Sequence, residues 1–166
     1  MVCNHTASEW EAIGTLTIGG RLSVSDSSYF FDNPVLLSLA PGTYAVMVRY
    51  GSGEGHKFVS ALRVARGGDL VRGSRLADVV VDFAQVGVCD RDAVERAFAF
   101  LGEDGMSAYF DQLQTLDLVK RVTLPDTEMF IVKSGYGDGF YPVYLLGASD
   151  QVPAGIEVDF EHPILG

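Results

Sequence analysis

Three aspartates at the ends of apolar, strand-like runs are the residues best suited to chemistry: Asp82, Asp90 and Asp138. Carboxylates at strand ends can meet at one rim of a β fold, and oxygen ligands of this kind bind divalent cations. Because a bound cation activates water, these acids, with Asp26 as a fourth member, predict a metal-assisted hydrolase as one hypothesis. The other interpretation is that each aspartate caps a helix or closes a turn.

The segment 134–144 is the most unusual stretch of the chain, because three glycines spaced by two precede three aromatic residues around a proline. Glycine allows the backbone to approach another surface closely. In the functional interpretation the segment forms a binding surface, whose candidate residues are Tyr136, Asp138, Tyr141 and Tyr144. In the structural interpretation it is a bend in which Asp138 bonds nearby amides and the two later tyrosines pack inward.

Several common sites are excluded by spacing. The glycines of this segment are followed neither by Lys-Ser or Lys-Thr, as in a phosphate loop, nor by a helical pattern, as in a dinucleotide fold. The spaced oxygen ligands and final glutamate of an EF-hand are also lacking. Cys89 lies in an apolar run, and the three histidines form no spacing motif. We therefore expect no cofactor, with a divalent cation only under the hydrolase hypothesis, and we assign no metal ligand.

Strand-like alternation dominates the elements that must position these residues. Side chains alternate along 43–50, and 57–65 returns after a glycine-rich loop, which predicts an antiparallel hairpin. The run 16–24 contains a central Gly-Gly pair and predicts a second hairpin. Strand character returns at 128–133, 140–146 and 155–161.

The middle of the chain combines an apolar run with a helix. Residues 78–90 predict two strand-like runs, or one central strand bent near Ala84. Asp90 or Asp92 then caps a helix, since apolar residues follow at helical spacing up to Gly102. A second short helix is expected over 106–116, with Phe110 and Leu113 facing inward.

These patterns predict one domain over residues 1–166. Its fold class is mainly β, an antiparallel β-sandwich or partly open barrel with one or two short helices inserted after the middle strand. The chain has 166 residues with 48% hydrophobic content, which is enough to build one core.

Charge limits the partners that the protein can have. The chain has 12 Lys and Arg against 22 Asp and Glu, a formal net charge of −10, so nucleic acid and membrane surfaces would repel it. A basic protein partner fits this charge, although excess acid also serves solubility alone. The oligomeric state stays open. Two cysteines and a start without a leader pattern predict a reducing, cytoplasmic location.

Three motifs resemble the domain-of-unknown-function family numbered 4241, which occurs in bacteria and their phages. The segment 134–144 together with 156–160 is similar to its glycine-aspartate-glycine and tyrosine-proline-valine-tyrosine signature. Residues 81–90 are similar to its middle motif, with Phe83-Ala84 where the family usually has Ser-Gly, and 41–44 to its first-half motif. The resemblance implies an architecture and a bacterial or phage setting but no reaction, and some members look like immunity-type proteins by genome setting.

The leading hypothesis is therefore a non-enzymatic interaction protein of the immunity or regulatory type. The alternative is the small metal-assisted hydrolase that uses the strand-end aspartates. A structural component of a phage or bacterial particle is a third possibility, for which a β framework is suited.

Overall fold

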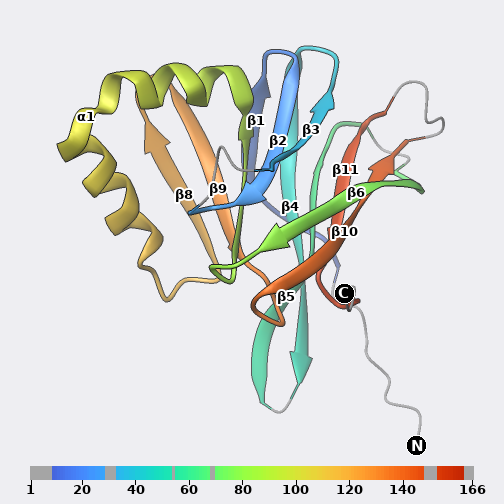
Figure 1. The fold of residues 1–166 in the computed structure, drawn as a ribbon. Helices are drawn as coiled ribbons and strands as arrows, with labels where there is room; N and C mark the ends of the chain where they lie inside the picture. Colours follow the sequence, from blue (N-terminus) through green and yellow to red (C-terminus); the bar gives the residue numbers. More distant parts are fainter. Residues whose placement is uncertain (1–8, 29–32, 54, 68–69, 148–152, 163–166) are drawn as a thin grey trace, which may run out of the picture.

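The computed structural model describes residues 9–28, 33–53, 55–67, 70–147 and 153–162, which form two antiparallel sheets and a helix (Figure 1). In these residues, sheet A has the strand order β1 (Glu11–Ile18), β4 (Gly42–Gly53), β5 (His56–Ala65), β11 (Gly155–Asp159), β10 (Gly139–Leu146), β6 (Arg72–Val81). Sheet B has the order β3 (Val35–Ser38), β2 (Arg21–Asp26), β7 (Gln85–Asp90), β9 (Thr127–Lys133), β8 (Val119–Leu124). The predicted fold class, a mainly β sandwich with a helix after the middle strand, is confirmed.

The core lies between the two sheets and follows from the alternation of side chains. In β4, Tyr44, Val46 and Val48 are buried, while the residues between them lie on the opposite face of sheet A. Strands of sheet B supply the facing apolar side chains, among them Leu22, Val24, Val86, Val88, Phe130 and Val132. Full burial of one such side chain contributes roughly 1.5–3 kcal/mol, so this layer is the main source of stability.

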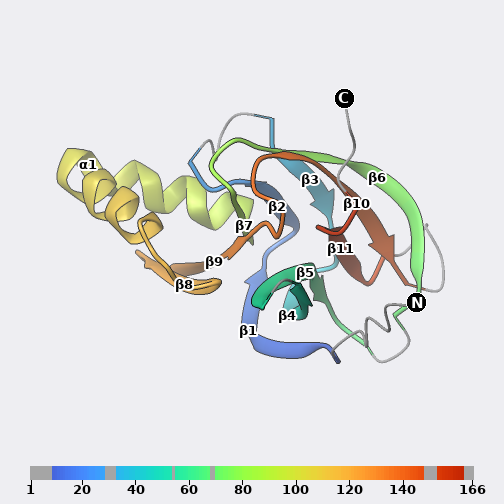
Figure 2. The same ribbon diagram turned by 90° about the horizontal axis from the view of Figure 1, so that it is seen from below.

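The helix α1 (Arg91–Leu113) covers the face of sheet B that points away from sheet A (Figure 2). Its N-cap is Asp90, one of the two predicted caps, and the Asp90 carboxylate accepts a hydrogen bond from the backbone N–H of Ala93 at 3.3 Å. A second apolar cluster fills the layer between helix and sheet: Cys89, Val94, Ala97, Tyr109, Leu113, Val122, Leu124, Met129 and Ile131.

A break in α1 overturns one prediction of burial. Gly102 has φ 61° and ψ −172°, which is not helical, so the residues after it begin a new helical phase. Leu113 is buried as predicted, but Phe110, predicted to face inward, is 43% exposed, and Tyr109 is buried instead. The period read from the first half of the helix does not continue across the break, which accounts for the difference.

The predicted hairpin over 16–24 is wrong. The two strands flanking Gly19-Gly20 lie in different sheets, because β1 pairs with β4 whereas β2 pairs with β3 and β7. The backbone N–H of Leu39 bonds the carbonyl of Gly20 at 2.9 Å. The glycine pair therefore carries the chain from one sheet to the other and does not close a hairpin.

Of the two alternatives predicted for 78–90, the structure has two separate strands, β6 and β7, and a second crossing between the sheets lies where the bent strand near Ala84 was considered. Residues up to Val81 belong to β6 in sheet A, and β7 in sheet B starts at Gln85, so the turn 82–84 joins two strands of different sheets. The link from β9 to β10 crosses in the opposite direction. Since β7 pairs with β9 and β6 with β10, both crossings lie at the same end of the sandwich.

In the part of the chain that the structure describes, no helix is both long enough and apolar enough to cross a membrane. The cytoplasmic location stays a prediction.

Candidate functional site

Asp26, at the end of β2, fixes the backbone of the turn 82–84. Its carboxylate is buried, with 4% of the residue exposed, and Oδ2 accepts hydrogen bonds from the N–H groups of Asp82 and Phe83, both at 2.7 Å. Oδ1 accepts a third bond, from the N–H of Ser28 at 2.8 Å. A carboxylate that accepts several backbone N–H groups makes strong, charge-assisted bonds, so Asp26 is a structural clamp.

Asp138 holds the same turn from the other crossing. Its Oδ1 accepts a hydrogen bond from the N–H of Ala84 at 2.9 Å, and the N–H of Ser134 bonds the Ala84 carbonyl at 3.1 Å. Two of the predicted site aspartates, with Asp26, therefore meet at this turn: Asp138 through its side chain and Asp82 through its backbone. The side chains of Asp82 and Asp138 are exposed.

Internal bonds shape the loop 134–138 between β9 and β10. Ser134 Oγ donates to the Gly137 carbonyl at 2.6 Å, and the Gly137 N–H bonds back to the Ser134 carbonyl at 3.1 Å. Tyr141 is fully buried, lies edge-on to Phe160 with ring centroids 5.2 Å apart, and donates its hydroxyl to the same Gly137 carbonyl at 2.8 Å. Burial raises the pKa of Tyr141 above its usual value. Tyr141, predicted as a binding residue, instead anchors the loop to the core.

The remaining predicted binding residues lie apart from each other. Tyr136 is 62% exposed at the tip of the loop, with its ring centroid 6.0 Å from that of Phe58 on β5. Tyr144 is half-buried farther along β10, under the guanidinium of Arg72, which lies 4.3 Å from the ring centroid. Only Tyr136 and Asp138 therefore remain as exposed members of the predicted surface.

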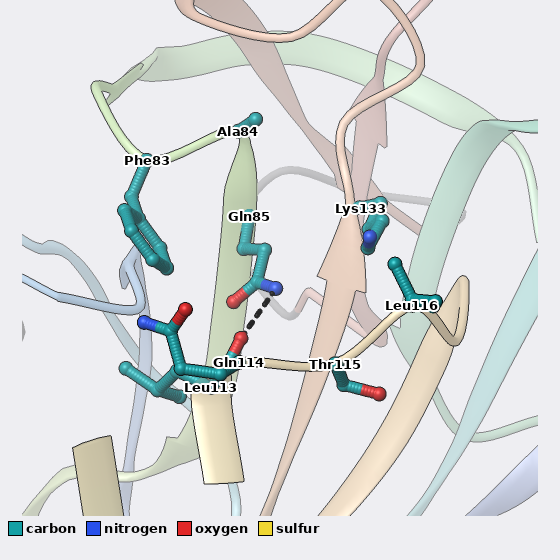
Figure 3. Close-up of a pocket in the computed structure, with 8 residues that line it drawn as sticks. All are labelled: Phe83, Ala84, Gln85, Leu113, Gln114, Thr115, Leu116 and Lys133. Atoms are coloured by element: carbon teal, nitrogen blue, oxygen red, sulfur yellow. Dashed lines mark hydrogen bonds between the residues drawn. The ribbon is translucent and has the colours of Figure 1, made fainter. Parts of the chain in front are cut away.

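A shallow pocket of about 340 Å³ lies beside this turn (Figure 3). Phe83 and Leu116 form apolar walls, and Lys133 is its charged residue. Gln85 links β7 to the end of α1 across the pocket, because its Nε2 donates a hydrogen bond to the Leu113 carbonyl at 3.0 Å. Its volume lies at the lower end of the range of small-ligand sites, and the pocket is open to solvent.

Exposed apolar side chains gather around the turn and the loop. Phe140 and Val80 are opposite each other on β10 and β6 and are 43% and 38% exposed. Phe83 is 37% and Leu116 95% exposed. We call the following set the turn–loop surface: Val80, Phe83, Leu116, Tyr136, Asp138 and Phe140. Large apolar side chains grouped around one carboxylate are typical of a surface that binds another protein.

Asp90, the third predicted catalytic aspartate, lies away from this end of the sandwich. It ends β7, whereas the turn 82–84 precedes that strand, which puts about 17 Å of extended chain between them. Both carboxylate oxygens of Asp90 are used, by the N–H of Ala93 and by the N–H of Gly19 at 3.1 Å. The three aspartates therefore do not form one cation site in the described structure.

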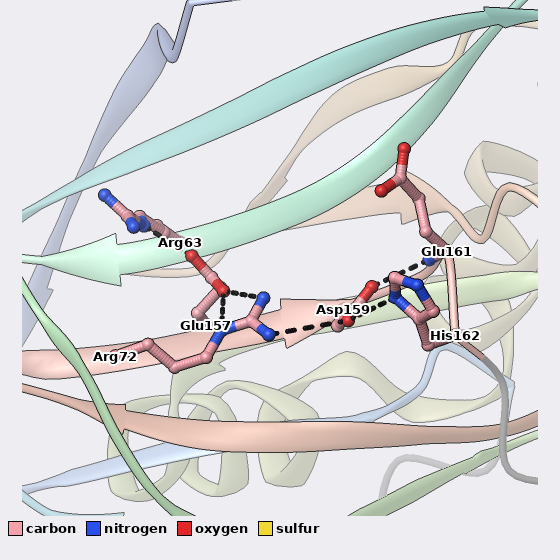
Figure 4. Close-up of polar contacts among 6 residues, drawn as sticks. All are labelled: Arg63, Arg72, Glu157, Asp159, Glu161 and His162. Atoms are coloured by element: carbon pink, nitrogen blue, oxygen red, sulfur yellow. Dashed lines mark hydrogen bonds and ion pairs between the residues drawn. The ribbon is translucent and has the colours of Figure 1, made fainter. Parts of the chain in front are cut away.

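A charged network that the sequence did not predict lies on the face of sheet A opposite the core (Figure 4). Glu157 is 2% exposed and is paired with two arginines: Arg63 Nε at 2.7 Å and Arg72, whose Nε lies 2.6 Å from Oε2. Asp159, two residues along β11, accepts from His162 Nδ1 at 2.9 Å and lies 3.6 Å from Arg72. The alternation of acids in 155–161 indicated a charged face on this strand. The arginines that pair with it could not be predicted, because they lie in strands far away in sequence.

Among the described residues, Asp159, Glu161 and His162 have ligand atoms close enough together for a metal ion. Asp159 is, however, already hydrogen-bonded to the Glu161 N–H at 2.9 Å and to His162, and it forms an ion pair with Arg72 at 3.6 Å. Because a neighbouring guanidinium opposes a bound cation, these groups are better explained as partners of one another.

Comparison with known proteins gives no relative: no family model matches the chain, and neither the curated proteins nor the solved structures contain a match. The resemblance to the family numbered 4241 therefore stays a prediction.

The backbone of Ala84 leads to a test of the turn. Ala84 has φ 55°, in the left-handed region. Such a conformation costs a residue with a side chain roughly 1–2 kcal/mol. Ala84→Gly is therefore expected to raise the free energy of unfolding by about 0.5–1 kcal/mol in urea titrations, after the entropy that glycine loses on folding is subtracted. In the control, Ala12→Gly at an exposed position of β1 should lower the free energy of unfolding. An Ala84→Gly variant less stable than the parent would contradict the conclusion that the left-handed backbone of Ala84 is strained.

Proposed function

We propose that the protein is a non-enzymatic interaction protein of the immunity or regulatory type, which binds a basic protein partner through the turn–loop surface. The observation that carries this proposal is the set of exposed apolar residues on a backbone fixed by the carboxylates of Asp26 and Asp138. Aromatic residues dominate the binding energy of protein interfaces, and the surface has three of them: Phe83, Tyr136 and Phe140.

The rigidity of the surface supports the proposal. The turn is held by Asp26, and the loop is held by Asp138, by the Ser134 hydroxyl and by Tyr141. A surface that is already ordered loses little conformational freedom when a partner binds, so more of the contact energy appears as affinity.

The charge of the protein supports a basic partner. The exposed carboxylates of Asp82 and Asp138 lie within the turn and loop, in a chain with a formal net charge of −10. Opposite charge on the partner speeds association and disfavours acidic competitors. The resemblance to family 4241, some of whose members look like immunity proteins by genome setting, is in keeping with this function.

The alternative, a metal-assisted hydrolase, receives no comparable support. Its acids are at two ends of β7, and Asp26, its fourth member, already accepts three backbone N–H groups.

Site-specific photo-crosslinking in the native host tests the proposal. A photo-reactive phenylalanine analogue replaces Tyr136 in one variant and Phe100 in the control, because Phe100 is 83% exposed on α1, away from the surface. We expect a discrete adduct with one basic protein from position 136 and none from position 100. The absence of an adduct at 136, or the same adducts at both positions, contradicts the proposal.

Binding measurements with the identified partner complete the test. Tyr136→Ala and Phe83→Ser are each expected to weaken binding at least about tenfold, as removal of an interface anchor does. Phe100→Ala should leave the dissociation constant unchanged. Equal affinities for all three variants would show that the turn–loop surface is not the interface.

A further inference from the structure

A hollow of about 580 Å³ lies on the face of sheet A opposite the core, where β1, β4 and β5 run side by side. Its floor is a row of small residues on adjacent strands, since Thr15 pairs with Ala45 and Ala45 with Ala65. Larger residues of the next row, Met47 and Arg63, form one side. The volume falls within the range of small-molecule sites, about 300–1,000 Å³.

Both charged residues that line this hollow are cations, although Arg63 is paired with the Glu157 carboxylate behind the lining. Its lining residues include two arginines, Arg63 and Arg66, and no acid. The rest of the lining is neutral: Trp10, Thr15, Thr43, Ala45, Met47, Ala65, Gly67 and Leu70. In a chain with 22 acids and 12 bases, a concave site whose charged lining residues are both cations is not explained by solubility. It is the arrangement that attracts an anion.

Arg63 is held in place at this hollow. Its Nε bonds the buried Glu157 carboxylate on the neighbouring strand (Figure 4), and its guanidinium lies 4.2 Å from the ring centroid of Trp10. A guanidinium has five N–H donors, and this bond uses one of them. In the described residues the terminal Nη groups of Arg63 make no hydrogen bond to another side chain, so they are available to a ligand.

Arg66 is held differently and has no carboxylate partner within the described ranges. Its guanidinium lies 5.0 Å from the ring centroid of Tyr44, and Nη1 is 3.4 Å from the Pro41 carbonyl. Gly42 makes room for it, since a Cβ at that position would lie 2.5 Å from Nη1 of Arg66. Arg66 is exposed, so its guanidinium is open to solvent and can bind an anionic group that enters the hollow.

We propose that this hollow binds a small organic anion, a carboxylate or a phosphate ester that carries an apolar group. Arg63 and Arg66 bind the anionic group, the Thr15 and Thr43 hydroxyls add neutral donors, and Trp10 with Met47 contacts the apolar part. The site is independent of the turn–loop surface, because Tyr136 contacts the opposite end of β5 at Phe58, about 23 Å along the strand from Ala65.

Fluorescence of Trp10 reports directly on this site, because it is the only tryptophan of the chain. Purified protein is titrated with phenyl phosphate, with phenylacetate and with the neutral 2-phenylethanol. We expect a saturable change with at least one anion and none with the alcohol. The anion that binds more tightly assigns the ligand to the phosphate or the carboxylate class.

Variants locate the binding. Arg66→Gln is expected to weaken it about tenfold, the loss typical of one charge-assisted contact. Gly42→Ala should weaken it as well, because the new methyl group displaces Arg66 without removing its charge. Since Gly42 has φ 155°, which a residue with a side chain rarely adopts, the binding of this variant is compared only under conditions where urea unfolding shows it to be folded. The control is Arg121→Gln, an exposed arginine on β8 in sheet B. The proposal is overturned if neither anion gives a saturable change, if the alcohol gives the same change, or if Arg66→Gln binds like the parent.

Discussion

Replacement of Asp26 by alanine is expected to lower the free energy of unfolding by about 3–5 kcal/mol, since it removes an acceptor from three backbone N–H groups. These groups lie at a partly buried crossing between the sheets, where water replaces the lost carboxylate poorly. Urea or guanidinium unfolding at neutral pH measures the change. The effect should also reach the turn–loop surface, because the turn 82–84 is no longer held.

Asp82→Ala is the matched control for Asp26→Ala. Asp82 belongs to the same turn, but its exposed side chain makes none of the hydrogen bonds described for the turn, to which it contributes its N–H. We expect a change within about 0.5 kcal/mol of the parent, as for other surface substitutions. Similar losses for both variants would mean that charge near the turn, and not the Asp26 clamp, sets its stability.

Glu157→Gln is the second substitution with a large expected effect. It keeps the size of the side chain but leaves Arg63 and Arg72 beside a neutral group, and the loss of one partner from a buried ion pair typically costs about 3–5 kcal/mol. Since Arg72 is 38% exposed and can be rehydrated, we expect a loss near the lower limit, about 3 kcal/mol. Chemical unfolding again measures it.

Salt and a neighbouring acid provide the controls for Glu157→Gln. Buried pairs are screened little by salt, so the difference from the parent should persist at high ionic strength. Glu161→Gln, an exposed acid close to the same network, should change stability by less than about 0.5 kcal/mol. A loss that disappears in salt would show that Glu157 acts as a surface charge.

Alternation of side chains allowed the strands to be predicted, and the predicted hairpin of 43–50 with 57–65 is confirmed by the antiparallel pairing of β4 with β5. Strand partners that lie far apart in sequence could not be predicted. The runs 43–50 and 155–161 were predicted as strands, and the structure has β4 and β11 there, with β11 ending at Asp159. A period of two shows which residues share a face, whereas pairing depends on chain segments far away in sequence. Gly19-Gly20 illustrates this, because a glycine pair suits a crossing between sheets as well as a hairpin turn.

The candidate site was predictable only in its residue types. Asp138 was expected either to meet a ligand or to bond amides, and it bonds the N–H of Ala84, 54 positions away. No local pattern gives that partner. Tyr141 has the same aromatic character as Tyr136, but its place in β10 turns it into the core, while Tyr136 is in the preceding loop. Glu157 was predicted to lie in a strand, but its pairing with Arg63 and Arg72 was not predicted.

The position of β11 between β5 and β10 has a consequence for how the protein is made. The Arg63–Glu157 bond spans 94 positions, and without β11 sheet A consists of two separate parts, β1-β4-β5 and β10-β6. Contacts of such long sequence range form slowly. While a ribosome is still translating, the facing edges of β5 and β10 are unpaired and prone to aggregation. We therefore expect folding to finish only after residues 155–159 have emerged from the ribosome.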